Sequence, residues 1–347
     1  MGIPGASNAV TICERARERK PRTLSAMKRA LAVVLLLAIP LVSHGQPAKK
    51  RVGFLSPGER ASHAFHEATF TQAMRDLGWR DGENLTIAYR FGGEKYERLR
   101  ALADDLVRLQ VDVIYAASAP AAQAAKDATT TLPIVFSMPQ DPVRAGLVAS
   151  LARPGGNLTG QAGLGPELDR KRLEMLKDIV PSLTYATILA NPTNPGTPQR
   201  LTEIEATARA LKLQLRVLNA ADRKALDAAF ETMARARPAG LLVLSDSTLI
   251  ENGGRIIDFA REHRIPAVYT SPGWAELGGL IEYTPDFAAV IRGAAAHVDR
   301  ILRGAKPGDL PVEQPRKFQL AINMRTAKAL GLTIPPSLRA AADQVIE

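Results

Sequence analysis

The feature that most constrains the fold is a single order of elements that occurs twice along the chain. In the first half, short runs rich in β-branched and aromatic residues alternate with stretches of helical periodicity. This alternation is typical of βαβ units, in which helices connect parallel strands. Strands are expected over 51–55, 85–89, 111–115 and 132–136. The first half is therefore predicted to be an α/β domain built on a parallel sheet.

The segments between these strands have the periodicity of helices. Gly78 is expected to end the first helix, and Pro120 to begin the helix after the third strand, where a missing N–H costs nothing. Residues three or four apart should share one face of the first helix. They are Phe65, Thr69, Ala73, Met74 and Leu77.

The second half repeats this plan. Strands are expected over 185–189, 213–218, 240–244 and 265–269, and the last of these resembles 132–136 in register and residue type. The segments that follow also correspond, 154–159 to 277–282. Five matching elements in one order predict two doubly wound parallel-sheet domains of the Rossmann type, joined by a hinge.

No long linker separates the halves, so the crossings are expected to be short, strand-like hinges near residues 159 and 279. The predicted N-terminal lobe covers 46–158 and about 279–308. The predicted C-terminal lobe covers 159–278 and about 309–347.

Residues 1–45 are predicted to be a leader that contains a secretory signal peptide over 27–45. A positive segment at Met27 to Arg29 precedes an apolar run over 30–39, and small residues stand before a cut between Gly45 and Gln46. The apolar run is shorter than the roughly 20 residues of a membrane-spanning helix. Translation from Met1 and translation from Met27 both stay open.

The leader also changes what the composition implies. It holds the only cysteine, Cys13, with seven of the 45 Lys and Arg and two of the 35 Asp and Glu. Its removal lowers the net charge from +10 to +5 and leaves no basic cluster of the kind that binds nucleic acid. Without a cysteine the rest of the chain has no disulfide, no thiol nucleophile and no acceptor for a lipid anchor, so a protein free in the periplasm is expected.

Small hydroxyl and amide residues, mixed with proline and glycine, follow the predicted strands. Ligands of open parallel sheets bind beyond the carboxyl ends of the strands, and helix N-termini there favour anions such as a carboxylate. The same residue types also cap helices and form turns, so either role is open for each of them. The predicted ligand-binding residues are Ser56, Ser118, Ala119, Gln140, Asp141, Asn191, Asn194, Ser245, Asp246, Ser247, Ser271 and Trp274.

Motifs of the common nucleotide-binding and hydrolytic sites are missing from the sequence. It has no Gly-rich phosphate loop, nucleophile elbow or His-Glu-x-x-His pattern. His63 and His66 lack a third ligand nearby, so surface or capping roles are expected in place of a metal site. No cofactor, metal or catalytic residue is predicted. An enzyme on a flavodoxin-like scaffold would need paired titratable groups, and only isolated Asp141, Asp246 and Glu276 stand near the predicted cleft.

Seven segments together carry a family resemblance, at 117–126, 132–136, 141–151, 154–160, 173–181, 190–195 and 322–332. They resemble the ABC transporter substrate-binding proteins of the tryptophan/tyrosine-type group, which have the type I periplasmic binding protein fold. The resemblance runs from about residue 50 to the end. It implies that the loops around Ser56, Ser118, Asp141, Asn191 to Asn194 and Ser245 to Ser247 face the cleft.

The resemblance also implies a function. The chain would be a periplasmic substrate-binding protein of an ABC importer, capturing a small polar or aromatic, amino-acid-like solute between two lobes by hinge closure. Its partners would be that solute and an ABC permease in the inner membrane, and a monomer is expected. The family commonly has Thr-Pro where this chain has Ala119-Pro120, which leaves the ligand open. An exported ligand-sensing module that feeds a kinase or chemoreceptor is the alternative.

Overall fold

A computed structural model of the chain describes residues 49–93 and 95–347. The predicted leader over 1–45, its signal peptide and the cut before Gln46 lie outside the described residues. Among the helices of the described part, none is long and apolar enough to cross a bilayer.

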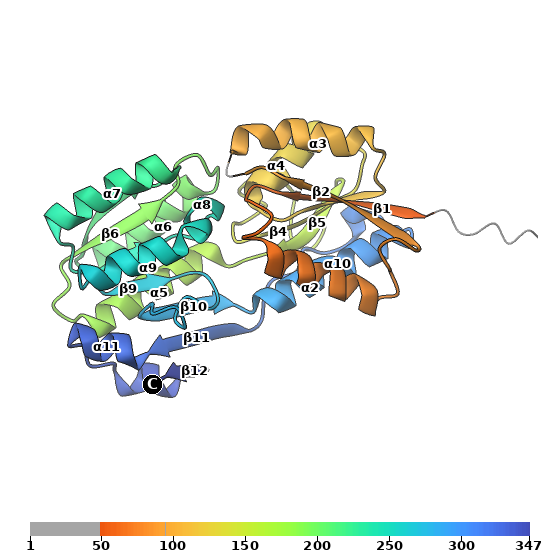
Figure 1. Ribbon diagram of the computed structural model, residues 1–347. Helices are drawn as coiled ribbons and strands as arrows, with labels where there is room; N and C mark the ends of the chain where they lie inside the picture. Colours follow the sequence, from red (N-terminus) through yellow and green to blue (C-terminus); the bar gives the residue numbers. More distant parts are fainter. Residues whose placement is uncertain (1–48, 94) are drawn as a thin grey trace, which may run out of the picture. The chain divides into compact units, whose positions relative to one another are not determined.

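The first sheet has five strands in the order β2-β1-β3-β4-β5, and every neighbouring pair is parallel. This is the doubly wound order of flavodoxin-like folds. Helices α3 and α4 cover one face, and α2 and α10 cover the other (Figure 1). Its elements are β1 (Lys50–Ser56), α2 (Ala64–Asp76), β2 (Leu85–Phe91), η1 (Tyr96–Arg98), α3 (Leu99–Arg108), β3 (Val113–Ala116), α4 (Ala119–Ala128), β4 (Ile134–Met138), β5 (Leu158–Ala162) and α10 (Phe287–Leu302). We call this unit the first lobe.

The second sheet has seven strands in the order β12-β11-β10-β9-β8-β6-β7. Read from β7 to β10, it repeats the strand order of the first sheet, and β11 then adds an antiparallel strand beside β10. The elements are α5 (Gly165–Ile179), β6 (Tyr185–Ala190), α6 (Thr197–Ala210), β7 (Gln214–Asn219), α7 (Arg223–Ala236), β8 (Leu241–Val243), α8 (Ser247–Glu251), α9 (Gly253–Glu262), β9 (Ala267–Tyr269), β10 (Ile281–Pro285), β11 (Phe318–Asn323), α11 (Met324–Leu330), α12 (Pro336–Ala340) and β12 (Gln344–Ile346). We call this unit the second lobe; a short 3-10 turn, η2 (Pro307–Asp309), lies before β11. The predicted fold class, two mostly parallel α/β sheets covered by helices, is confirmed.

The chain passes between the two sheets three times. Strand β5 belongs to the first sheet and β10 to the second, so the first two passages follow residues 162 and 285. The third precedes β11, where Glu313 runs beside β5 and accepts a hydrogen bond from the backbone N of Ala162 at 2.9 Å. The passages therefore lie a few residues beyond the crossings predicted near 159 and 279.

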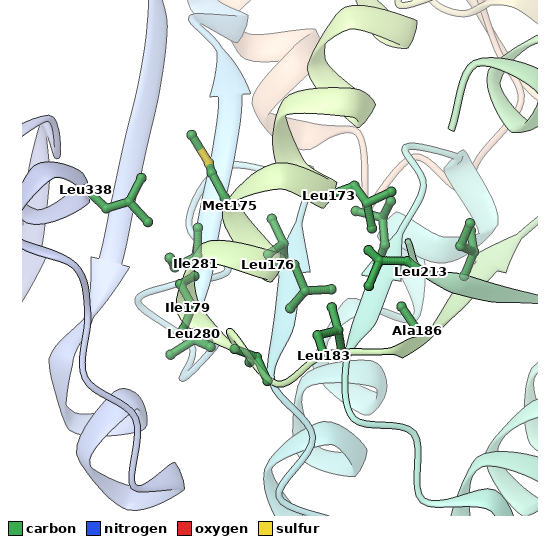
Figure 2. Close-up of a cluster of buried hydrophobic side chains, with 14 of the residues drawn as sticks. Leu173, Met175, Leu176, Ile179, Leu183, Ala186, Leu213, Leu280, Ile281 and Leu338 are labelled. Carbon is green, nitrogen blue, oxygen red and sulfur yellow. The ribbon is translucent and has the colours of Figure 1, made fainter. Parts of the chain in front are cut away.

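A hydrophobic core fills the space between α5 and the second sheet. Leu173, Leu176 and Ile179 stand three residues apart on α5, so they share the helix face that meets the strands. Figure 2 shows Leu176 and Ile179 beside Ile281 of β10. Burial of these side chains anchors the C-terminal half of α5, and the N-terminal half carries residues of the site described below.

The predicted face of the first helix needs one correction. Ala73 and Met74 of α2 are buried as expected, but Phe65 is 58% exposed. The aromatic residue that α2 buries is Phe70, whose ring stacks on Tyr115 with centroids 4.6 Å apart. The predicted face omitted Phe70 because its spacing was counted from Phe65. Counted from Phe70, the i, i+3 and i+4 positions are Phe70, Ala73 and Met74, which are buried together.

Candidate functional site

Loops at the carboxyl ends of strands from both sheets surround one cavity of about 140 Å³. The first lobe contributes the segments after β3 and β4 and part of α10, and the second contributes the segments after β8 and β9 and the start of α5. The volume is close to the roughly 150 Å³ of an engineered cavity that holds benzene. The cavity therefore suits a compact solute of about one ring.

Seven of the twelve predicted ligand-binding residues line this cavity. They come from loops of both lobes, as strand-end loops of two facing parallel sheets should. They are Ser118, Ala119, Gln140, Asn194, Ser245, Asp246 and Ser247.

The other five predicted residues lie elsewhere. Ser56 and Ser271 are buried at the ends of β1 and β9, and Asn191 is buried beneath the loop that carries Asn194. Trp274 does not reach the cavity: it is 6% exposed and packs in the core of the second lobe, its ring centroid 5.4 Å from that of Tyr269. Burial in the core stabilises a large apolar ring more than exposure in a cleft, which explains why the prediction for Trp274 was wrong.

Asp141 lies in a separate, more polar hollow. Its carboxylate accepts the backbone N–H of Val143 at 2.8 Å, the geometry of a turn residue. The hollow has a volume of about 210 Å³ and is also lined by Arg144, Glu203 and Arg170. Arg144 and Glu203 pair with each other there at 2.9 Å. We place the site in the cavity at the strand ends, because buried polar groups without partners converge there and not in this hollow.

Asp246 is the most heavily hydrogen-bonded side chain of the cavity wall. Its Oδ1 accepts from Asn191 Nδ2 at 3.1 Å and from the backbone N of Thr248 at 3.0 Å. Its Oδ2 accepts from Asn194 Nδ2 at 2.9 Å and from the hydroxyl of Tyr96 at 2.7 Å. Tyr96 belongs to the first lobe, so this carboxylate ties the two lobes together. Burial and the neighbouring Asp246 both raise the pKa of Tyr96, which keeps the hydroxyl a donor.

A second contact joins the lobes at Glu251. Its Oε1 accepts from the backbone N of Glu59 at 2.6 Å and from the hydroxyl of Ser62 at 2.9 Å. A Cβ at Gly58 would lie 2.2 Å from the same oxygen. A side chain at position 58 would therefore displace the Glu251 carboxylate from this contact.

Two arginines that the sequence reading did not single out also line the cavity. Arg172 of α5 and Arg200 of α6 are 2% and 1% exposed, and both hold Asp169, which is completely buried. Arg200 reaches Asp169 through two bonds of 2.6 and 2.8 Å, and Arg172 through one of 2.8 Å. The three side chains carry a net charge of +1. The pKa of Arg172 is lowered to about 10, mainly by burial and to a smaller extent by Arg200, while Asp169 partly offsets both.

The predicted surface or capping roles of the histidines need correction. His63 and His66 both line the cavity, and His66 Nε2 lies 2.5 Å from the hydroxyl of Tyr115, which in turn lies 2.9 Å from Ser137 Oγ. Burial, with a smaller contribution from His63, lowers the pKa of His66 to about 3, so its ring is neutral at pH 7. Within the described chain, no group of His, Cys, Asp and Glu could hold a metal ion.

Two polar atoms of the cavity wall have no partner in the described chain. They are Gln140 Oε1 and Thr270 Oγ1, on side chains only 2% and 1% exposed. Buried polar groups are nearly always hydrogen-bonded, and an unsatisfied one costs about 1–3 kcal/mol. Both atoms are therefore available to a bound ligand.

The residues that sequence reading missed share a cause. Arg172 follows Arg170 and Lys171 in a helix, where charged residues usually face solvent. The one available signal was its i,i+3 spacing from Asp169, which surface pairs share. Tyr96 lies just before α3, and nothing local indicated its partner 150 positions away.

Comparisons with known proteins agree with this architecture. The family model described as ABC transporter substrate binding protein matches residues 52–346. The tyrosine-binding protein of Clostridioides difficile (strain R20291) is 26% identical over 284 residues, which cover 82% of this chain and 81% of that protein.

Two solved structures are similar over most of the chain. A conserved domain protein from Vibrio cholerae O1 biovar El Tor superposes with a TM-score of 0.80 at 26% identity, covering 86% of this chain and 99% of that one. The ABC domain in complex with L-Trp from Streptococcus pneumonia has a TM-score of 0.79 at 23% identity and covers 86% and 100%. The family and the tyrosine-binding relative are binding proteins and not enzymes. The expected resemblance is confirmed, and the chain belongs to the ABC transporter substrate-binding protein family.

Proposed function

We propose that this protein is the periplasmic substrate-binding component of an ABC importer and captures a small polar or aromatic, amino-acid-like solute between its two lobes. One observation supports this most directly. Strand-end loops of both lobes surround a single cavity whose wall contains buried polar atoms without partners, Gln140 Oε1 and Thr270 Oγ1. The tyrosine-binding relative supports an amino-acid-like solute.

Hinge closure is the proposed mechanism. The three passages between the sheets are short, and hydrogen-bonded contacts at Asp246, at Glu251 and in the Arg144–Glu203 pair bridge the lobes. A solute that binds the closed arrangement better than the open one shifts the equilibrium toward closure. Opening would break the hydrogen bonds of Tyr96 and Ser62 to the second lobe, because each residue bonds that lobe through a single hydroxyl.

The proposed setting follows from the family and from the predicted signal peptide over 27–45. We propose export to the periplasm, a monomeric state and delivery of the solute to a permease in the inner membrane. A sensory module would use the same cavity. Pull-down from a membrane extract separates these possibilities, because recovery of a permease supports transport, whereas recovery of a kinase or chemoreceptor supports sensing.

A thermal-shift screen tests the binding proposal. The mature chain is heated with amino acids, aromatic acids, nucleobases and sugars. A ligand that binds the folded state raises the free energy of unfolding by mass action, by about 2.7 kcal/mol at 100 times Kd, and so raises the melting temperature. Ser118→Trp fills the cavity and is expected to abolish the shift. It also removes the cap that Ser118 Oγ provides to the backbone N of Ala121, so a drop of about 1 kcal/mol in stability without ligand is expected.

Ser337→Trp is the matched control, because Ser337 is exposed on α12, away from the cavity wall. It should keep the full ligand shift. Binding that survives Ser118→Trp would mean that the site lies elsewhere, and no shift across the whole panel would count against a small-solute binder.

A further inference from the structure

The charged groups of the cavity differ in how completely their hydrogen bonds are used. A guanidinium has five N–H donors. Arg172 directs three of them to the Tyr283 carbonyl and Asp169, and Arg200 directs three to Asp169 and the Ser245 carbonyl. Two N–H groups on each arginine thus have no acceptor in the described chain. Both side chains are almost completely buried and line the cavity, so a ligand acceptor there would satisfy donors that the described chain leaves without a partner.

Asp246 is the only carboxylate among the described residues of the cavity wall. Unlike the two arginines, it has no hydrogen-bonding position left for a ligand. A carboxylate has about four acceptor positions. Asp246 has four donors on it, from Tyr96, Asn191, Asn194 and the backbone of Thr248. Asp246 has the negative charge that would attract a ligand ammonium. Its oxygens, however, already accept hydrogen bonds from loops of the second lobe and from Tyr96 of the first.

Asp169 offers no alternative to an ammonium. It lies outside the cavity wall, has no exposed surface, and receives three hydrogen bonds from Arg172 and Arg200. A buried ammonium without a carboxylate partner is strongly disfavoured. The free acceptors of the wall, Gln140 Oε1 and Thr270 Oγ1, are neutral, and suit a hydroxyl or amide of the ligand.

From this asymmetry we infer that the cavity recognises the carboxylate of its solute through Arg172 and Arg200 and has no receptor for an α-ammonium. The ligand class is a compact organic carboxylate with a neutral, largely apolar body. Pro120, Met138, Phe287 and Ile291 supply the apolar wall for that body. The inference rests on the proposed function, of which it specifies the substrate class.

Paired ligands that differ only in the ammonium test the inference on the unaltered protein. Isothermal titration compares L-phenylalanine with 3-phenylpropanoate and L-tyrosine with 3-(4-hydroxyphenyl)propanoate, and includes phenethylamine, which lacks the carboxylate. The propanoates are expected to bind at least about tenfold more tightly than their amino acids, and phenethylamine not at all. Equal or tighter binding of the amino acids would overturn the inference and leave the proposed function standing. If neither these nor any solute of the wider screen binds, the proposed function itself fails.

Two substitutions assign the roles. Arg172→Lys keeps the charge but loses the planar fork, and should weaken propanoate binding by about 10- to 100-fold. Asp246→Asn should weaken both members of a pair by the same factor, because it loosens the contact with Tyr96. A selective loss of the amino acid in Asp246→Asn would identify Asp246 as an ammonium receptor and overturn the inference. The melting temperature of each variant without ligand reports whether it is folded, and the wild-type comparison stands if one is not.

Discussion

The two lobes have the same strand order, but they supply different chemistry to the cavity. The first lobe presents neutral groups, among them Ser118, Gln140 and the neutral His66. The second presents the charged ones, Arg172 and Arg200 with Asp246. The second sheet also carries two additional strands, β11 and β12, beyond the repeated set of five.

This difference teaches that topology and recognition are separable. The shared strand order brings loops of both lobes to one cavity, whatever their residues are. Which solute enters depends on side chains that the repeat does not specify. Anion recognition in this protein is therefore assigned to the second lobe, and the first lobe closes over the solute with neutral groups. The predictions that follow test this division of roles.

The largest effect is expected from the buried charges of the second lobe. Asp169→Asn should lower the free energy of unfolding by about 3–5 kcal/mol, because it leaves Arg172 and Arg200 buried together without a counter-charge. Urea unfolding measures the loss. Asp104→Asn is the control in the first lobe, where an exposed i,i+4 pair with Arg100 should contribute at most about 0.5 kcal/mol. Similar losses in both variants would contradict the special role of the buried cluster.

A pH effect is expected from the first lobe. The pKa of His66 is lowered to about 3 in the folded state, against about 6.5 in the unfolded chain, so the unfolded state binds more protons in between. The stability contributed by the neutral His66 ring is fully present above about pH 6.5. It is lost as the pH drops toward 3, by up to about 1.4 kcal/mol per pH unit. By pH 5 the His66 contribution to this loss approaches about 2 kcal/mol.

His66→Gln should flatten the plot of the urea unfolding midpoint against pH between about pH 6.5 and 3. His263→Gln changes an exposed histidine of the second lobe and should leave the profile as it is. An unchanged slope in His66→Gln would show that His66 is not the group responsible.

The smallest effect concerns the bond between the lobes. Tyr96→Phe removes the first-lobe hydroxyl that bonds Asp246 of the second lobe. It should weaken ligand binding by about fivefold, or about 1 kcal/mol, because closure loses one hydrogen bond. Tyr89→Phe removes a hydroxyl that bonds Thr71 inside the first lobe and should leave the Kd unchanged. If the two variants bind alike, Tyr96 has no part in closure.

Much of the fold could be predicted because its signals are local. The strand expected over 51–55 is observed as Lys50–Ser56, and that expected over 185–189 as Tyr185–Ala190. The repeat then predicted two sheets of one type. The points at which the chain changes sheets were harder to predict from the sequence. Strands β5 and β10 have ordinary strand sequences, and tertiary packing decides which strands they pair with.

The site was predicted in part, for a related reason. Ser118, Gln140 and Asp246 follow predicted strands, and a general rule about strand ends places such residues at a ligand site. Arg172 and Arg200 lie within helices, and His66 lies on a helix with no metal partner. Their contribution depends on which face of each helix meets the cavity, which a helical pattern of charges does not reveal.

The sequence alone determined the two-part α/β plan and the strand-end loops, because hydrophobic periodicity and turn residues act over a few positions. Only the tertiary structure decided that Asp246 is engaged by four donors, that Arg172 and Arg200 keep donors without acceptors, and that Trp274 packs in a core. These properties depend on the burial and mutual distance of groups far apart in the chain. A hydrogen bond between residues 96 and 246 has no local signature, and the chemistry of the cavity is made of such contacts.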